Sequence, residues 1–184
     1  MDYYSLAKQY YYKKLYEKAF NIFVDGAKSG DVFCSFEVAN CYLNGLGVKP
    51  NRDYANNLIV TVINELEKMT NQDGKAEYYL SLIHGLSFLM SSKTKEKSYL
   101  KEAKRLGYKD ALVLEVNNIS DLSLYAEEGN YYALSKLMSF YSHMKSQEDS
   151  FEKYGLIALE NNYIDLSFKL LNFYRLNNMV DKYE

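Results

Sequence analysis

Two histidines and a set of serine–lysine pairs are the residues of this sequence that could support covalent chemistry. A lysine three residues after a serine lies on the same side of a helix, and some serine acyl-transfer enzymes use this spacing. The pattern occurs at Ser5–Lys8, Ser92–Lys95, Ser98–Lys101, Ser142–Lys145 and Ser150–Lys153. The companion S-D-N and K-T-G motifs of those enzymes are absent from the sequence. The pairs are therefore interpreted as polar faces of helices.

The two histidines do not form a site with each other. His84 lies in the apolar stretch YYLSLIHGLSFLM, which is typical of a packed helix, and His143 lies far from it in sequence. No set of cysteines, histidines and carboxylates has the spacing of a metal site, and no serine lies in a G-x-S-x-G elbow. The sequence predicts no catalytic residue, no metal and no cofactor. Because catalytic triads assemble in space from distant residues, an enzyme with such a site stays one of the alternatives for the function.

The basic segment 93–109, KTKEKSYLKEAKRLGYK, could bind an anion. It holds seven lysines and arginines against two glutamates, together with two tyrosines. Cationic residues interleaved with aromatic ones are typical of surfaces that bind nucleic acid. Lys101, Lys104 and Arg105 are the candidate contacts for nucleic acid or a small anionic ligand. The alternatives are a solvated helix face, or a charged surface that complements a protein partner.

The glycine-rich stretch CYLNGLGVKPNRDYA (41–55) could cradle a phosphate or turn one helix into the next. A dinucleotide-binding loop needs G-x-G-x-x-G after a strand, and a P-loop needs a Gly-Lys-Ser/Thr end; neither is present. The stretch is therefore interpreted as a structural turn. We expect Val48 to pack between helices, Asn51 to cap the next helix, and Pro50 to stiffen its approach.

The elements that position these residues are predicted to be α-helices of a single domain over residues 1–184. Apolar residues recur at helical spacing, and long strand-like alternation is missing. The formal charge of −2 creates no field that would attract nucleic acid or a membrane surface. No signal peptide or membrane-spanning stretch is predicted, so the cytoplasm is the expected compartment. Cys34 and Cys41 are seven residues apart in one predicted helix, which is beyond disulfide reach, and they are expected to be buried thiols.

Self-similar turns divide the predicted helices into pairs. The turn residues are Gly30, Gly74, Gly107, Gly129 and Asn162, at intervals of 44, 33, 22 and 33 residues. These intervals predict an α-solenoid, a right-handed stack of about five antiparallel helix pairs that bury their apolar faces on one another. The interval of 22 residues predicts one shortened repeat near 107–129.

The stretch 41–55 also resembles the Sel1-like repeat family, which is related to tetratricopeptide repeats. The residues that match the family pattern in type and spacing are Tyr42, Gly45, Gly47, Val48, Asn51 and Ala55, with Ala19 and Gly30 upstream. The match covers residues 15–55, and the later repeats share only the alanine, glycine and tyrosine positions. An asparagine stands at position 51 where the family more often has aspartate, and no second Gly-x-Gly-Val loop follows. The resemblance implies a non-catalytic scaffold for protein interactions.

The predicted binding surface is formed by the first helix of each pair, which commonly lines the concave face of such stacks. Positions seven and ten after each turn residue are expected to point away from the core. They select as partner contacts Glu37, Asn40, Lys136, Ser139, Lys169 and Asn172. Reversing the charges of Glu37, Lys136 and Lys169 together is expected to abolish binding and to leave the helices intact.

The expected mode of action is occupancy of a protein partner. The sequence holds 20 tyrosines, and a surplus of tyrosine over what packing needs favours a binding protein. The protein is expected to be a monomer or a weak homodimer. It would act as an adaptor or as a stand-alone inhibitor of a partner enzyme, two roles that the sequence does not separate.

Overall fold

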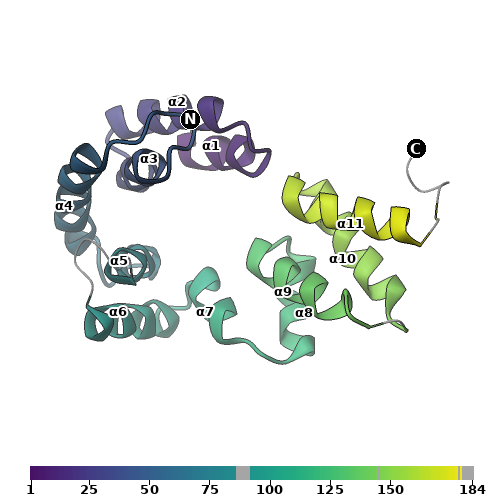
Figure 1. Ribbon diagram of the computed structural model, residues 1–184. Helices are drawn as coiled ribbons and strands as arrows, with labels where there is room; N and C mark the ends of the chain where they lie inside the picture. Colours follow the sequence, from purple (N-terminus) through teal and green to yellow (C-terminus); the bar gives the residue numbers. More distant parts are fainter. Residues whose placement is uncertain (86–91, 145, 178, 180–184) are drawn as a thin grey trace. The chain divides into compact units, whose positions relative to one another are not determined.

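The computed structural model describes residues 1–85, 92–144, 146–177 and 179, and within them the chain forms eleven α-helices and no β-strand (Figure 1). The helices are α1 (Tyr3–Tyr12), α2 (Tyr16–Lys28), α3 (Val32–Asn44), α4 (Arg52–Lys68), α5 (Lys75–Gly85), α6 (Lys93–Arg105), α7 (Lys109–Glu115), α8 (Ile119–Glu127), α9 (Tyr131–Tyr141), α10 (Glu148–Glu160) and α11 (Ile164–Leu176). The all-helical prediction is confirmed. Packing between helices that are neighbours in sequence is consistent with a helical repeat. The Sel1-like repeat type and its superhelical hand stay predictions.

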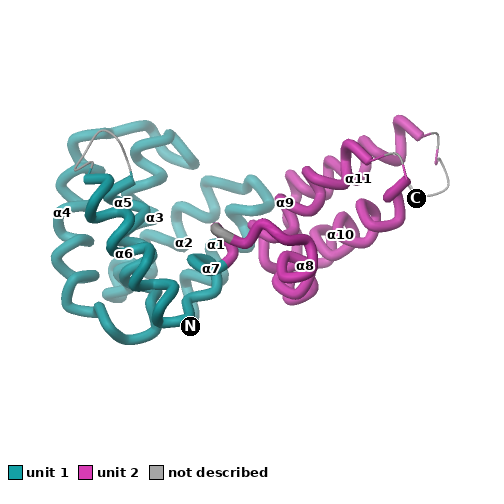
Figure 2. The backbone as a smooth tube through the Cα atoms, turned by 90° about the horizontal axis from the view of Figure 1, so that it is seen from below, with its two compact units in different colours: residues 1–112 teal, residues 113–184 magenta. Residues whose placement is uncertain are grey.

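The chain divides into two compact units (Figure 2). Unit 1 comprises residues 1–112 and unit 2 comprises residues 113–184, so the border falls within α7. The sequence predicts one domain over residues 1–184 and gives no sign of this border. None of the described helices is both long enough and apolar enough to cross a membrane.

Unit 1 is built from the helix pairs α1/α2, α3/α4 and α5/α6. Within this unit α1, α3 and α5 lie along the inner side of an arc, and α2, α4 and α6 lie along its outer side (Figure 1). One core cluster lies between the first helices and contains Ala7, Ala19, Phe23, Cys34, Val38 and Cys41. Both cysteines are free and buried, as predicted, and burial raises the pKa of each thiol to about 12.

The predicted turn residues are confirmed as turns, because Gly30, Gly74, Gly107, Gly129 and Asn162 all have positive φ angles. The glycine-rich stretch between α3 and α4 is also a turn. Gly45, with φ +69°, ends α3 in the left-handed conformation, and Val48 packs against the core cluster of unit 1. The backbone N–H of Asn51 donates to the carbonyl of Tyr42 over 3.0 Å, which closes the loop.

Asn51 caps α4, because its side-chain oxygen accepts the backbone N–H of Tyr54 over 3.0 Å. We expect Asn51→Ala to lower the free energy of unfolding by about 1 kcal/mol, the usual value of such a cap. Asn57→Ala is the matched control, since Asn57 is exposed in the middle of the same helix, where alanine is the better helix former. Urea denaturation followed by circular dichroism measures both. Equal stability of the two variants would contradict the capping role.

Unit 2 places α8 and α10 in one layer and α9 and α11 in the other, and its main contacts join successive helices across the two layers (Figure 2). Its buried core includes Leu134, Leu137 and Met138 from α9 and Leu166 and Leu170 from α11. Helix α8 has nine residues and α7 has seven, and these short helices occupy the predicted shortened repeat.

The hydroxyl groups of several tyrosines in unit 2 are hydrogen-bonded to neighbouring helices. Tyr131 on α9 donates to Asp165 on α11 over 2.7 Å, and Tyr174 on α11 donates to Glu152 on α10 over 2.8 Å. These bonds let a polar ring lie in the helix interface without an unsatisfied hydroxyl. Part of the tyrosine content is therefore explained by packing.

Candidate functional site

Three of the six predicted partner contacts meet at one groove in unit 2. Ser139 lies on α9, Lys169 and Asn172 lie on α11, and all three line a hollow of about 400 Å³. The other residues that line it are Met138, Ser142, Phe151, Phe173 and Leu176. We call this hollow the α9–α11 groove.

Helical periodicity brings these side chains to the groove. On α11, Leu166, Leu170 and Tyr174 fill the core, so Lys169 and Asn172 are left on the exposed side. Positions three and seven residues apart share a helix face. Lys169, Asn172 and Leu176 therefore form one stripe on α11, just as Ser139 of α9 and Ser142, the residue that caps α9, do on the other side of the groove.

The groove combines an aromatic floor with polar groups. The rings of Phe151 and Phe173 have centroids 4.8 Å apart, and Phe151 is buried. Leu176 is 76% exposed, and next to the polar stripe α11 also exposes 57% of Phe168. The Lys169 ammonium has no partner among the described residues. An apolar floor with one unpaired cation fits an amphipathic ligand that carries a carboxylate.

The aromatic and apolar part of the groove was not predicted. Leu176 follows Asn172 by four residues and Lys169 by seven, so extending the predicted stripe by one helical turn would have found it. Phe151 comes from α10, a different helix. No spacing rule in the sequence relates it to α11.

The Lys136 ammonium is bonded within the chain and does not line the α9–α11 groove, so its contact with a partner stays a prediction. Its ammonium donates to the backbone carbonyls of Val113, Leu114 and Val116 over 3.0, 2.9 and 3.2 Å. These carbonyls lie at the C-terminal end of α7, where a cation is favoured by the helix dipole. Lys136 therefore stabilises a helix end.

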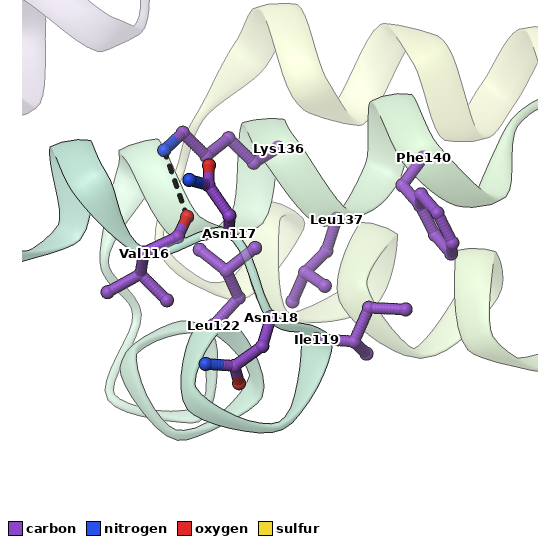
Figure 3. Close-up of a pocket in the computed structure, with 8 residues that line it drawn as sticks. All are labelled: Val116, Asn117, Asn118, Ile119, Leu122, Lys136, Leu137 and Phe140. Atoms are coloured by element: carbon purple, nitrogen blue, oxygen red, sulfur yellow. Dashed lines mark hydrogen bonds between the residues drawn. The ribbon is translucent and has the colours of Figure 1, made fainter.

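A second hollow, of about 380 Å³, lies beside this cap (Figure 3). It is lined by Val116, Asn117, Asn118, Ile119, Leu122, Lys136, Leu137 and Phe140. Figure 3 shows the Lys136 amine reaching toward the Val116 carbonyl, while Phe140 lies on the opposite side. The Lys136 ammonium is already bonded to three carbonyls. This hollow therefore offers a ligand mainly an apolar surface.

Glu37 does not point away from the core, which corrects the orientation that the sequence predicts for it. It is only 4% exposed, and its carboxylate lies 3.2 Å from the Lys8 ammonium of α1. The Tyr4 hydroxyl and the Asn40 amide donate to the same carboxylate, each over 3.5 Å. Asn40 is half-buried beside it. Helix α1 covers this face of α3, so position seven of the first repeat is internal.

The surroundings of Glu37 form an aromatic and cationic cluster that was not predicted. The hydroxyls of Tyr4 and Tyr79 are hydrogen-bonded to each other, and burial raises the pKa of both phenols well above the usual range. The Lys75 ammonium lies 3.9 Å from the centroid of the Phe33 ring, within the range of a cation–π contact. The cluster joins α1, α3 and α5 within unit 1.

Carboxylates lie close to the cationic residues of the basic segment 93–109. Arg105 forms a two-pronged ion pair with Glu102, with nitrogen–oxygen distances of 2.9 and 2.6 Å. Lys101 is exposed but lines a hollow together with three glutamates, and Lys104 is half-buried. Carboxylates placed this close reduce the attraction for phosphate groups.

The residues considered for covalent chemistry have structural partners. His84 is buried on α5, as predicted, and its ring stacks on Tyr99 with centroids 5.7 Å apart. His143 is exposed, and its Nδ1 lies 3.0 Å from the Ser142 hydroxyl. Among the described residues no carboxylate is hydrogen-bonded to its ring. Ser92 caps α6, and Lys145 of the Ser142–Lys145 pair lies outside the described residues.

Metal ligands are not gathered anywhere in the described part of the chain: it holds no group of three or more histidine, cysteine, aspartate or glutamate side chains that could bind a metal ion. Comparison of the chain with protein-family models, with curated proteins and with solved structures finds no match.

Proposed function

We propose that this protein is a non-catalytic, Sel1-like helical-repeat protein that binds a partner protein through the α9–α11 groove. The observation that carries the proposal is the convergence of Ser139, Lys169 and Asn172 on one groove with an aromatic floor. Residues from two helices are held there by a packed core, so the surface is formed before a partner arrives.

The partner segment that fits this groove is an amphipathic helix with an acidic residue. Its apolar side chains would cover Phe173 and Leu176, and its carboxylate would pair with Lys169. Hydroxyl and amide groups of Ser139 and Asn172 would bond to polar groups at the rim. Binding of this kind acts by occupancy, either joining two proteins or covering the active site of one.

Reversing the charge at Lys169 tests the proposal. We expect Lys169→Glu to weaken binding of the partner about tenfold or more, because it places two carboxylates together in the groove. The partner is first captured from a cell extract with the whole chain, with and without nuclease, and its affinity for each variant is then measured by calorimetry.

Lys49→Glu is the matched control. Lys49 is exposed in the turn before α4 in unit 1, so its reversal changes the net charge equally without touching the groove. Both variants should melt at the temperature of the unchanged chain. Equal affinities of the two variants would place the interface elsewhere, and capture that disappears with nuclease would favour the basic segment 93–109.

A further inference from the structure

Unit 1 contains a polar hollow that the proposed function does not use. It has a volume of about 600 Å³ and is formed by the end of α4, the following turn, α5 and α6. It is lined by Glu67, Thr70, Asn71, Glu77, Ser98, Tyr99, Lys101 and Glu102. Three carboxylates and one ammonium therefore face this space.

Glu77 is the most unusual of these residues, because it is only 1% exposed. One carboxylate oxygen, Oε1, accepts the backbone N–H of Asn71 over 2.5 Å. The other oxygen, Oε2, is buried and has no hydrogen-bond partner among the described residues. A buried carboxylate oxygen without a donor is costly, and native proteins rarely leave one unsatisfied. Glu77 therefore lacks one hydrogen-bond donor.

The residues around Glu77 do not supply that donor, and the Lys101 ammonium that lines the same hollow is not bonded to Oε2. Tyr99 donates its hydroxyl to Glu67 over 3.5 Å, and Arg105 is engaged by Glu102. Burial and the neighbouring carboxylates of Glu67 and Glu77 raise the pKa of the Tyr99 phenol. With Glu102 paired to Arg105, the carboxylates of Glu67 and Glu77 still outnumber the Lys101 ammonium. The lining of the hollow is thus negative, although one of its walls is α6, which belongs to the basic segment 93–109.

We propose that this hollow binds an alkylammonium group, with Glu77 Oε2 as the acceptor of an ammonium N–H. An ammonium brings several N–H donors and a positive charge, and so supplies both things that Glu77 lacks. Glu67 adds attraction at the rim, and Tyr99 adds an aromatic wall. This site goes beyond the proposed function, since it lies in unit 1 and does not depend on the α9–α11 groove.

Titration calorimetry of the full chain tests the site. The probes are spermidine, a free polyamine, and Nα-acetyl-lysine methylamide, which carries a single lysine side chain; about 0.15 M salt screens loose attraction to surface charges. Binding of spermidine alone would assign the site to free polyamines. Binding of both probes would assign it to a single ammonium, including a lysine of a partner protein. No binding of either probe would overturn the proposal.

Glu77→Gln is the decisive variant, because it keeps the size and the acceptor for Asn71 but removes the charge. We expect it to weaken amine binding about tenfold or more. Glu65→Gln is the control, since Glu65 is exposed on α4 and pairs with Lys68 outside the hollow. It should bind the amine as the unchanged chain does. Equal binding by the Glu77→Gln variant would overturn the proposal.

A local signal separates binding in the hollow from an effect on folding. The backbone amide of Asn71 reports on Glu77, so its nuclear magnetic resonance signal should shift on addition of the bound probe. The probe should also raise the melting temperature of the unchanged chain but not that of Glu77→Gln. Binding that leaves the Asn71 signal in place would overturn the proposal.

Discussion

Gly47→Ala is expected to destabilise unit 1 by about 2–5 kcal/mol in total, of which the larger part arises because the new methyl group meets the backbone of another helix. An added Cβ would lie 2.2 Å from the carbonyl oxygen of Tyr16 and 2.6 Å from the backbone nitrogen of Glu17. These atoms belong to the first turn of α2, which packs on α1 and α3. They cannot rotate away as a side chain could.

The backbone conformation of Gly47 adds to this cost, since its φ of +72° is unfavourable for residues with a Cβ. Gly30→Ala separates the two effects. Gly30 has a φ of +88°, but no atom lies within 4 Å of an added Cβ, so only the conformational cost of about 1–2 kcal/mol is expected. Urea denaturation of both variants measures the difference. If Gly47→Ala and Gly30→Ala lost equal free energies of unfolding, the loop around Gly47 would be able to move away from α2 at little cost.

Glu37→Lys is expected to destabilise unit 1 by about 3–5 kcal/mol, the usual result of breaking a buried ion pair by removing one partner. The variant would place a second ammonium beside Lys8 at a position that is only 4% exposed. The Tyr4 hydroxyl and the Asn40 amide would also lose their acceptor. Spacing alone leads to the expectation that reversing Glu37, Lys136 and Lys169 together leaves the helices intact, whereas the burial and pairing of Glu37 predict a loss of stability.

Exchanging the charges of Lys8 and Glu37 tests whether the broken ion pair causes the loss of stability. The double variant Lys8→Glu with Glu37→Lys restores opposite charges, so it should recover part of the lost stability in a double-mutant cycle. Lys169→Glu should leave the free energy of unfolding nearly unchanged, because Lys169 is exposed and unpaired in the described chain. Full stability of the Glu37→Lys variant would mean that α1 does not cover this face of α3.

Local features of the fold could be predicted from the sequence because they depend on neighbouring residues. The helical spacing of apolar residues predicted the helices. A glycine or asparagine at each turn predicted the turns with positive φ angles, as at Gly30 and Asn162. The cap by Asn51 follows from its place before α4. In each case the deciding interaction spans only a few residues.

Interactions between distant segments could not be predicted in the same way. Helical spacing predicts on which side of their helices Glu37 and Lys136 lie. It does not predict which other helix covers that side. Lys8 lies 29 residues from Glu37 along the chain, and the Val113 carbonyl lies 23 residues from Lys136. The border between the units was missed for a related reason. It falls within α7, so no linker composition marks it.

The pairing of successive helices has a consequence for how the chain folds during synthesis. Apart from the short α7, the main contacts of each helix join it to the helix before or after it, so forming these contacts closes only short loops. Each helix pair can therefore form soon after it leaves the ribosome, without waiting for the C-terminus. All helices of the first three pairs, α1 to α6, are encoded before residue 112. Unit 1 can thus assemble its core while unit 2 is still being translated.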